Sequence, residues 1–288
     1  MVTNELYRIP VCEMKELNNL FIELTAKNCN QHCKHCYIDF PITKAKKDYI
    51  SQETIKTALN DTTQENIYCI YLTGAEPMLH PDFNSILRMC LKRTNVCICT
   101  NGSFLNEKKV RFLKKVEDES TNEIIFMLPI DHYEEIKNDD IRGRGAFRQI
   151  IHASQKLEKY DFNPIYTVTN FYNENEKTLI EGLKKVFLSS SVQVQDFNFQ
   201  INKYYNKYSN KDNIVENFNQ NHIDCSCGRI LTEKGVYSCP FLANDYRGRM
   251  GTDFKNYSKK VMLETPFCWT CSKNKENMFS INYKYFNS

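Results

Sequence analysis

Long apolar runs are missing from this chain of 288 residues, although 41% of its residues are hydrophobic. No stretch approaches the roughly 18 apolar residues of a membrane span, and Met1–Pro10 lacks the apolar core of a secretion signal. We therefore expect a cytoplasmic protein with no membrane partner. A strong charge bias is missing too, because the formal net charge is only +3. This charge is too small to indicate a nucleic-acid partner.

Internal repeats and low-complexity tracts are also absent, and short apolar runs alternate with helical patterns along most of the chain. The runs predict six strands, at 20–25, 67–73, 96–100, 124–129, 164–168 and 192–197. Helices are expected between them, at 54–59, 83–92, 108–116, 146–158 and 178–188. Such alternation is typical of α/β proteins with a parallel sheet. Six units fit a partial (β/α)6 TIM barrel better than a closed eight-fold one.

The composition changes after the sixth predicted strand. We assign residues 1–197 to the barrel, 198–222 to a linker rich in Asn, Lys and Tyr, and 223–288 to a small C-terminal domain. Within that domain, 229–232 and 236–239 predict a hairpin, with Gly235 in its turn. A small piece with little core and several cysteines indicates a domain stabilised by metal.

Thirteen cysteines are many for such a chain. Cytosolic thiols stay reduced, so metal sites explain clustered cysteines better than disulfides do. A first group follows the first predicted strand, and it consists of Cys29, Cys33 and Cys36. A second group lies in the C-terminal domain: Cys225, Cys227, Cys239, Cys268 and Cys271. The others lie on or beside predicted strands and helices, where most are expected to be core residues: Cys12, Cys69, Cys90, Cys97 and Cys99.

The first group supplies three cysteine ligands, one fewer than the number of irons in a [4Fe–4S] cluster. Three thiolates can hold three irons of a cubane iron–sulfur cluster and leave the fourth iron free. An open metal position is typical of catalytic sites, and barrel active sites lie at the C-terminal ends of the strands. Zinc is the alternative, because His32 or His35 would complete a four-ligand site.

The spacing Cys-x3-Cys-x2-Cys, followed by Tyr37, resembles the radical S-adenosylmethionine (radical SAM) superfamily. The resemblance continues at later strand ends. Thr73-Gly74-Ala75-Glu76-Pro77 resembles the family's Gly-Gly-Glu-Pro segment, with Ala75 in place of one glycine. Cys99-Thr100-Asn101-Gly102 resembles its Thr-Asn-Gly turn. The segment after the fourth strand resembles that of peptide-modifying members, with Ile130-Asp131-His132 followed by Ile141-Arg142-Gly143 and Phe147. Val168-Thr169-Asn170 ends the fifth strand in the same manner.

The resemblance implies two cofactors for the barrel. One is a [4Fe–4S] cluster on Cys29, Cys33 and Cys36, and the other is S-adenosylmethionine. The reduced cluster cleaves S-adenosylmethionine into methionine and a 5′-deoxyadenosyl radical, which takes a hydrogen atom from the substrate. An electron donor such as flavodoxin or ferredoxin is implied as a partner. The residues expected to bind S-adenosylmethionine are Tyr37, Gly74, Ala75, Glu76, Pro77, Thr100, Asn101, Asp131 and Asn170.

The second cysteine group resembles the C-terminal extension called SPASM, or its shorter form, twitch, which binds auxiliary clusters. A full SPASM extension uses seven cysteines, and five are present here, so the resemblance implies one auxiliary [4Fe–4S] cluster. Three residues separate Gly235 from Cys239, where four are usual. The ligands expected are Cys227, Cys239, Cys268 and Cys271. A structural zinc on four cysteines is the alternative.

Cys225 is then left over, and three interpretations remain open. It is a ligand in place of Cys227, a small buried residue, or a thiol that returns a hydrogen atom to the substrate, as in some radical SAM epimerases. We expect a ribosomally synthesised peptide as substrate, with epimerisation or crosslink formation as the reaction. The alternatives are a small molecule, such as an aminoglycoside or a sugar alcohol, and a non-catalytic zinc or iron–sulfur protein. Only 28 residues precede Cys29, so we expect a peptide leader to need another docking surface.

Overall fold

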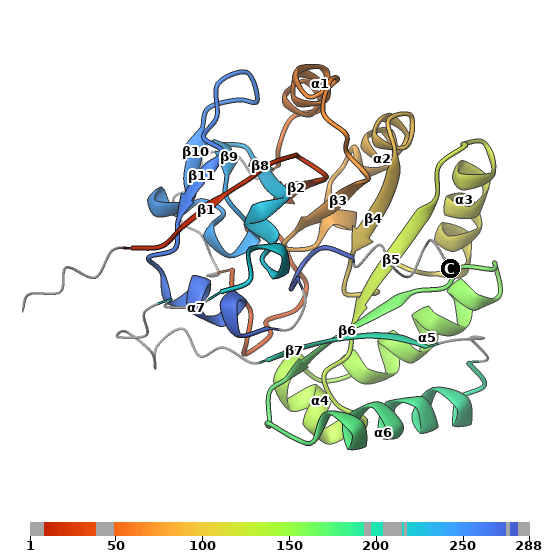
Figure 1. Cartoon of the computed structure of the whole chain (residues 1–288). Helices are drawn as coiled ribbons and strands as arrows, with labels where there is room; N and C mark the ends of the chain where they lie inside the picture. The colour runs from red at the N-terminus through yellow and green to blue at the C-terminus, as the bar shows by residue number, and fades with distance from the viewer. Residues whose placement is uncertain are drawn as a thin grey trace, which may run out of the picture.

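One sheet of nine strands forms the framework of the computed structural model, which describes residues 9–38, 49–192, 197–203, 215, 218–274 and 277–281 (Figure 1). Six neighbouring strands run parallel and follow chain order. They are β2 (Asn19–Thr25), β3 (Cys69–Gly74), β4 (Asn95–Cys99), β5 (Ile124–Pro129), β6 (Ile165–Asn170) and β7 (Asn198–Lys203). This arrangement confirms the α/β class and the partial barrel.

Helices connect these strands and cover the outer face of the sheet (Figure 1). They are α1 (Gln52–Asp61), α2 (Phe83–Leu91), α3 (Glu107–Asp118), α4 (Glu135–Arg142), α5 (Ala146–Glu158) and α6 (Glu176–Ser189). Side-chain caps fix several of their starts; the Ser51 hydroxyl, for example, accepts a hydrogen bond from the Thr54 amide at 3.0 Å. The helix α4 was not predicted, because most of its sequence is charged or polar.

The two faces of the parallel strands carry different parts of the core. Leu20 and Ile22 of β2 point to the helices and belong to the large cluster that fills this layer. Phe21 of the same strand points into the barrel, where its ring stacks on Tyr71 with centroids 4.4 Å apart. All seven residues of β2 are buried. Burial on both faces explains why the sequence showed these strands as continuous apolar runs.

The C-terminal segment extends the same sheet. Its strands lie beside β1 and β2 in Figure 1, and β8 pairs in parallel with β2. The elements are β8 (Gly228–Thr232), β9 (Gly235–Tyr237), β10 (Arg249–Gly251), β11 (Lys260–Met262), which pairs with β1 (Val11–Glu13), and α7 (Pro266–Lys273). The antiparallel pair β8–β9 confirms the predicted hairpin. Its pairing with β2 was not predicted, because long-range strand pairing has no local signal.

The sixth predicted strand was wrong in position. The described residues at 192 and 197 are not in a strand, and the sixth parallel strand is Asn198–Lys203, inside the predicted linker 198–222. This strand is half-buried and alternates polar residues with Phe199 and Ile201, so it lacks a continuous apolar run. The sheet therefore crosses both boundaries predicted at 197 and 223. Residues 204–214 and 216–217 of the linker lie outside the described residues.

None of the described helices is both long and apolar enough to cross a membrane.

Candidate active site

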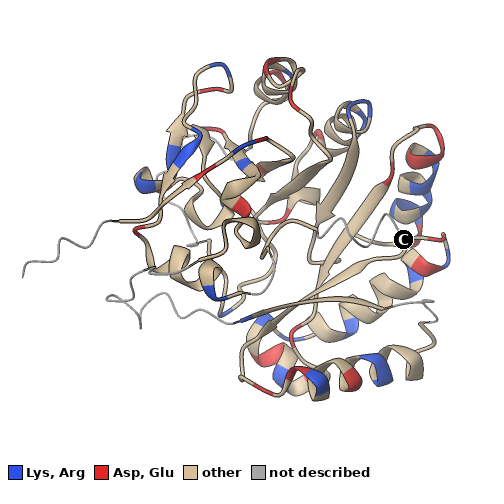
Figure 2. Cartoon of the chain, viewed as in Figure 1, with Lys and Arg blue, Asp and Glu red and all other residues tan. Residues whose placement is uncertain are grey.

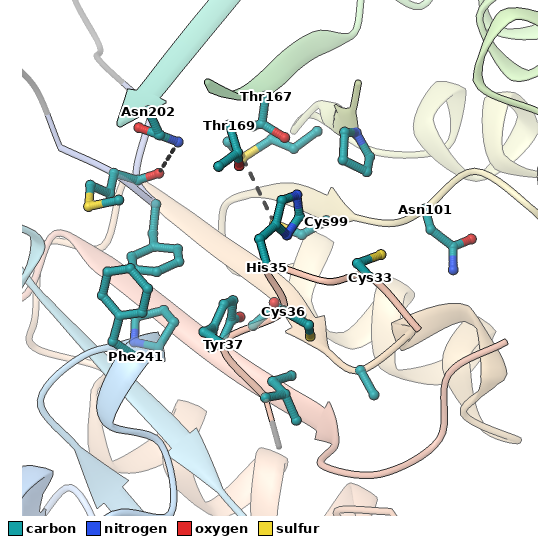
Figure 3. Close-up of a pocket in the computed structure, with 18 of the residues that line it drawn as sticks. Cys33, His35, Cys36, Tyr37, Cys99, Asn101, Thr167, Thr169, Asn202 and Phe241 are labelled. Carbon is teal, nitrogen blue, oxygen red and sulfur yellow. Dashed lines mark hydrogen bonds between the residues drawn. The ribbon is translucent and has the colours of Figure 1, made fainter. Parts of the chain in front are cut away.

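A cavity of about 300 Å³ lies at the C-terminal ends of the parallel strands (Figure 3). The three cysteines of the first group line it together: Cys29, Cys33 and Cys36. Five residues expected to bind the cofactor line it as well: Tyr37, Gly74, Ala75, Thr100 and Asn101. The structure therefore brings the motif after β2 next to the motifs that end β3 and β4.

Helix α4 holds the cysteine loop through backbone and side-chain contacts. The Lys34 amide donates to the Ile141 carbonyl at 2.8 Å, and the Lys34 ammonium lies 2.6 Å from Asp140. Arg142, the last residue of the helix, places a guanidinium nitrogen 3.9 Å from the Cys33 sulfur. The loop thus has a rigid support, although neither α4 nor this docking was evident from the sequence.

Asp131 lies behind the loop and is 1% exposed. One carboxylate oxygen contacts Arg142 Nε at 2.6 Å and His35 Nε2 at 2.7 Å, and the other accepts from the Thr169 amide at 2.8 Å. Burial alone would raise the pKa of Asp131, but Arg142 and His35 lower it well below its usual value. The carboxylate is therefore charged and joins β5, β6, α4 and the cysteine loop.

For the cysteines, in contrast to Asp131, burial outweighs the neighbouring charges and the pKa values rise. It raises the pKa of Cys36 to about 11, and it also raises the pKa of Cys33 although the Arg142 charge opposes this rise. Iron binds the thiolate form of cysteine. A buried cation beside Cys33 therefore favours the form that ligates a metal.

Glu76 joins the ends of β3 and β4. Its carboxylate accepts from the Thr100 hydroxyl at 2.7 Å, the Asn101 amide at 2.9 Å and the Met78 amide at 3.1 Å. The side chain is 0% exposed, and burial raises its pKa. Glu76 therefore shapes the cavity wall from behind and does not line it.

Gly74 is required by the backbone at this point. Its φ is +121°, and a Cβ there would lie 2.4 Å from the Thr25 carbonyl oxygen. The next amide, of Ala75, donates to the same carbonyl at 2.7 Å. The close approach of β3 to β2 explains the glycine, whereas Ala75 fills the position that is glycine in the Gly-Gly-Glu-Pro pattern.

Several predicted cofactor residues do not line the cavity in the described part of the chain. Glu76 and Asp131 support it from behind, and Pro77 is not among its lining residues. The Asn170 side chain stabilises the loop after β6 instead. Its amide nitrogen donates to the Glu174 carbonyl at 2.7 Å, and its amide oxygen accepts from the Glu174 backbone amide at 2.9 Å. Thr167 and Thr169 line the cavity from β6 instead.

One wall of the cavity is aromatic and consists of Tyr37, Phe241, Phe267 and Phe279. Tyr37 was expected at the site, whereas the three phenylalanines had no signal in the sequence. Phe241 stacks on Phe267 with centroids 4.7 Å apart and meets Phe279 edge-on at 4.8 Å. On the same side of the cavity, the Asn202 side-chain amide of β7 donates a hydrogen bond to the Met278 carbonyl at 3.3 Å (Figure 3). Segments that are far apart in the sequence, from the cysteine loop, β7 and the C-terminal part of the chain, thus form one wall of the cavity.

Asp224 fixes the C-terminal part of this wall. Its buried carboxylate accepts from the amides of Met278, Phe279 and Ser280 at 2.8 to 3.2 Å. The Ile281 amide donates to the Tyr71 hydroxyl at 2.8 Å. Residues 277–281 are therefore tied to the barrel interior.

Cys99 is a further site residue that sequence reasoning missed. We expected a core cysteine, but its side chain lines the cavity and lies 3.9 Å from the Met127 sulfur. Every second residue of β4 faces the barrel interior, so Cys97, two residues before Cys99, also faces inward and lies in the barrel core. The other scattered cysteines are buried, as expected: Cys12, Cys69, Cys90 and Cys97.

The radical SAM superfamily model matches residues 24–186, which is more than half of the chain and includes the three cysteines of the first group and the strand ends of β3 to β6. The chain belongs to the radical SAM superfamily. Membership implies S-adenosylmethionine and one [4Fe–4S] cluster. The subtilosin biosynthesis protein AlbA of Bacillus subtilis is 30% identical over 129 residues. That alignment covers 44% of this chain but only 27% of AlbA.

Solved structures show the same fold at low identity. The structure of anSMEcpe with bound AdoMet has a TM-score of 0.64 at 15% identity, covering 86% of this chain and 77% of that one. SuiB of Streptococcus suis, bound to the precursor peptide SuiA, has a TM-score of 0.60 at 14% identity, covering 81% and 62%. At these identities the likeness concerns the fold alone.

The first cysteine group fits a radical SAM cluster better than a single zinc ion. Zinc–sulfur bonds of about 2.3 Å bring ligand sulfurs within roughly 4 Å of one another. Among the described residues, no three His, Cys, Asp or Glu side chains converge to hold one ion. A cluster separates its ligands further, and three thiols around one cavity suit it. His35 is engaged with Asp131, at 2.7 Å.

In the structure, four cysteines of the second group lie together and the fifth, Cys227, lies apart from them. A small cavity is lined by the four thiols: Cys225, Cys239, Cys268 and Cys271. Cys227 points elsewhere, because its sulfur accepts from the Asn19 side chain at 3.3 Å. Burial raises the pKa of Cys239 to about 12, with Cys268 adding to the rise. Three expected ligands thus lie together, and Cys225 occupies the place expected for Cys227.

Proposed function

We propose that the substrate of this radical SAM enzyme is a ribosomally synthesised peptide, in which it epimerises a residue or forms a crosslink. The alignment with AlbA, a protein of bacteriocin subtilosin biosynthesis, carries the proposal. The SuiB structure, with its precursor peptide SuiA, supports it at the level of the fold. The chain aligns with about a quarter of AlbA, so the substrate itself is not transferred from that relative.

The walls of the cavity suit a peptide. Thr169, Asn202 and Lys203 bring polar groups to the strand ends, and such groups can bind backbone amides. Phe241 and Phe279 provide an apolar surface for one side chain. A sugar or an aminoglycoside, the alternative substrate, would need polar partners on most of its faces.

Each part of the site has a role in this proposal. Cys29, Cys33 and Cys36 would hold the catalytic cluster, which would supply the electron needed to cleave S-adenosylmethionine. The strand ends at Gly74–Ala75 and Thr100–Asn101 orient S-adenosylmethionine against the cluster. The aromatic wall excludes water from the reacting hydrogen atom.

We assign the second cysteine group to an auxiliary [4Fe–4S] cluster, with Cys225, Cys239, Cys268 and Cys271 as ligands. Their common cavity supports this set. It favours the ligand interpretation of Cys225 over the hydrogen-donor interpretation, because Cys225 does not line the main cavity in the described residues. In an epimerase, the candidate hydrogen donor is then Cys99, because it is the one described thiol that lines that cavity outside the Cys29, Cys33 and Cys36 motif.

The test incubates a candidate precursor peptide, sought among the short reading frames near this gene, in D₂O with the reconstituted enzyme, dithionite and S-adenosylmethionine. Epimerisation predicts a D-residue that carries deuterium at its α-carbon, and a crosslink predicts the loss of two hydrogen atoms. Mass spectrometry and hydrolysis with chiral analysis distinguish the two. An unchanged peptide, together with oxidation or inversion of a sugar alcohol, would contradict the proposal.

A further inference from the structure

A second hollow, of about 310 Å³, lies on the outer surface between the loop after β4 and helix α5. Arg148, His152 and Lys156 line it at spacings of four residues, so they lie on one face of α5. Arg148 and Lys156 are its charged lining residues, and no described lining residue is acidic. The chain as a whole has mixed charges along its helices (Figure 2). The hollow is therefore locally basic.

One residue separates this hollow from the catalytic cysteines. Gln149 lines the hollow and donates to the Asn101 carbonyl at 2.8 Å. The Asn101 side-chain amide lies 3.7 Å from the Cys29 sulfur. Ser103, also in the hollow, accepts from Asn30 at 2.9 Å, next to Cys29 in the chain. The hollow thus borders the outer side of the cysteine loop, and the main cavity borders its inner side.

We propose that this hollow docks the small acidic protein that delivers electrons to the catalytic cluster. The inference rests on the radical chemistry assigned above, which needs one electron from outside for each cleavage. The inner side of the loop is used by S-adenosylmethionine and substrate, so delivery from the outer side does not compete with them. Encounters of electron-transfer proteins are small and weak, and opposite charges steer them.

The basic side chains are free enough to serve this role. Arg148 forms a surface pair with Glu135 at 2.8 Å, and its side chain is 73% exposed. Such a pair contributes little and exchanges partners readily. Lys156 has no ion pair with any other described residue. Neither residue belongs to the cofactor or substrate site described above.

The test compares two routes of reduction in the double variant R148E/K156E. Dithionite reduces the cluster directly, whereas flavodoxin, reduced by its reductase and NADPH, must dock first. We expect the affinity for flavodoxin at low salt, measured by titration calorimetry, to fall by about tenfold or more, together with the 5′-deoxyadenosine formation that flavodoxin drives. Formation driven by dithionite should stay within about twofold of the wild type. The control K184E/K185E makes the same charge change on α6, at exposed positions, and should leave both rates unchanged.

Each outcome has a distinct meaning. An equal loss in both assays, or no loss with flavodoxin, would overturn the docking site. Equal losses in both double variants would show a general charge effect and would also overturn it. A wild type that works with dithionite but with neither flavodoxin nor ferredoxin would contradict the proposed carrier. If dithionite itself produces no 5′-deoxyadenosine in the wild type, the radical chemistry fails and not the docking site alone.

Discussion

The Asp131 carboxylate lies 2.6 Å from Nε of Arg142, and both side chains are buried. This ion pair joins the end of β5 to the end of α4, directly behind the cysteine loop. Arg142 in turn contacts the sulfur of Cys33. The pair therefore couples the stability of the barrel to the position of Cys33, a proposed cluster ligand.

Replacement of Asp131 by Asn should loosen this arrangement. It leaves the Arg142 guanidinium buried without a charged partner, which costs about 3–5 kcal/mol. We expect a lower melting temperature and less iron per chain after reconstitution. Asp140→Asn is the control, because Asp140 pairs with Lys34 of the same loop but is 50% exposed; it should cost no more than about 1 kcal/mol. Equal iron content in wild type and Asp131→Asn would contradict the positioning role.

The auxiliary ligand set predicts different results for two neighbouring cysteines. Cys225→Ala should lose roughly four irons per chain, since a [4Fe–4S] cluster uses four cysteine ligands. Cys227→Ala should keep them, because that sulfur lies with Asn19 and not with the other thiols. Iron analysis and the charge-transfer absorption measure both. Iron loss in Cys227→Ala alone would restore the assignment expected from the sequence.

The glycine at position 74 should be irreplaceable. Gly74→Ala puts a side chain at φ +121°, against the Thr25 carbonyl. Such backbone strain alone costs about 1–3 kcal/mol, and the contact adds to it. Ala75→Gly is the matched control and should change the free energy of unfolding by less than about 1 kcal/mol. Urea denaturation measures both variants, and equal stabilities would refute the close approach of β3 to β2.

Glu23 should make stability fall as the pH rises. Burial raises its pKa from the usual 4.5 to about 6, although Asn244 donates to it at 2.7 Å. The folded state therefore holds the proton more tightly than the unfolded state. The contribution is complete below about pH 4.5 and is lost as the pH rises through 6.

Glu23→Gln removes this dependence. We expect the variant to gain about 1 kcal/mol relative to wild type between pH 5 and pH 7.5, because part of the effect is already lost at pH 5. Urea denaturation at the two pH values measures the difference. Glu181→Gln, at an exposed position on α6, is the control and should show no such gain. A wild type whose stability rises over this range as much as that of the variant would disprove the raised pKa.

The sequence predicted the elements and motifs that depend on local patterns. Continuous apolar runs marked β2 and β3, because both strands are buried on two faces. The order of motifs placed Cys29, Gly74 and Asn101 at neighbouring strand ends, where the structure finds them. The charged helix α4 had no apolar pattern and was missed.

The other errors came from contacts between distant segments. Nothing near Asp224 in the sequence signals that it binds the backbone at 278–280 and fixes a cavity wall. At the end of β6, alternation along the strand decides that Thr169 lines the cavity whereas Asn170 does not. The same holds for Cys225 and Cys227, which are two residues apart but lie in different surroundings. Spacing alone did not distinguish them.

The formation of 5′-deoxyadenosine tests the central claim most directly. The protein is reconstituted anaerobically with iron and sulfide, reduced with dithionite, and incubated with S-adenosylmethionine. We predict that the wild type releases 5′-deoxyadenosine and methionine, that Cys29→Ala releases neither, and that Cys90→Ala, which changes a core cysteine of α2, retains the reaction. Bound zinc without iron, and no 5′-deoxyadenosine from the wild type, would contradict the account.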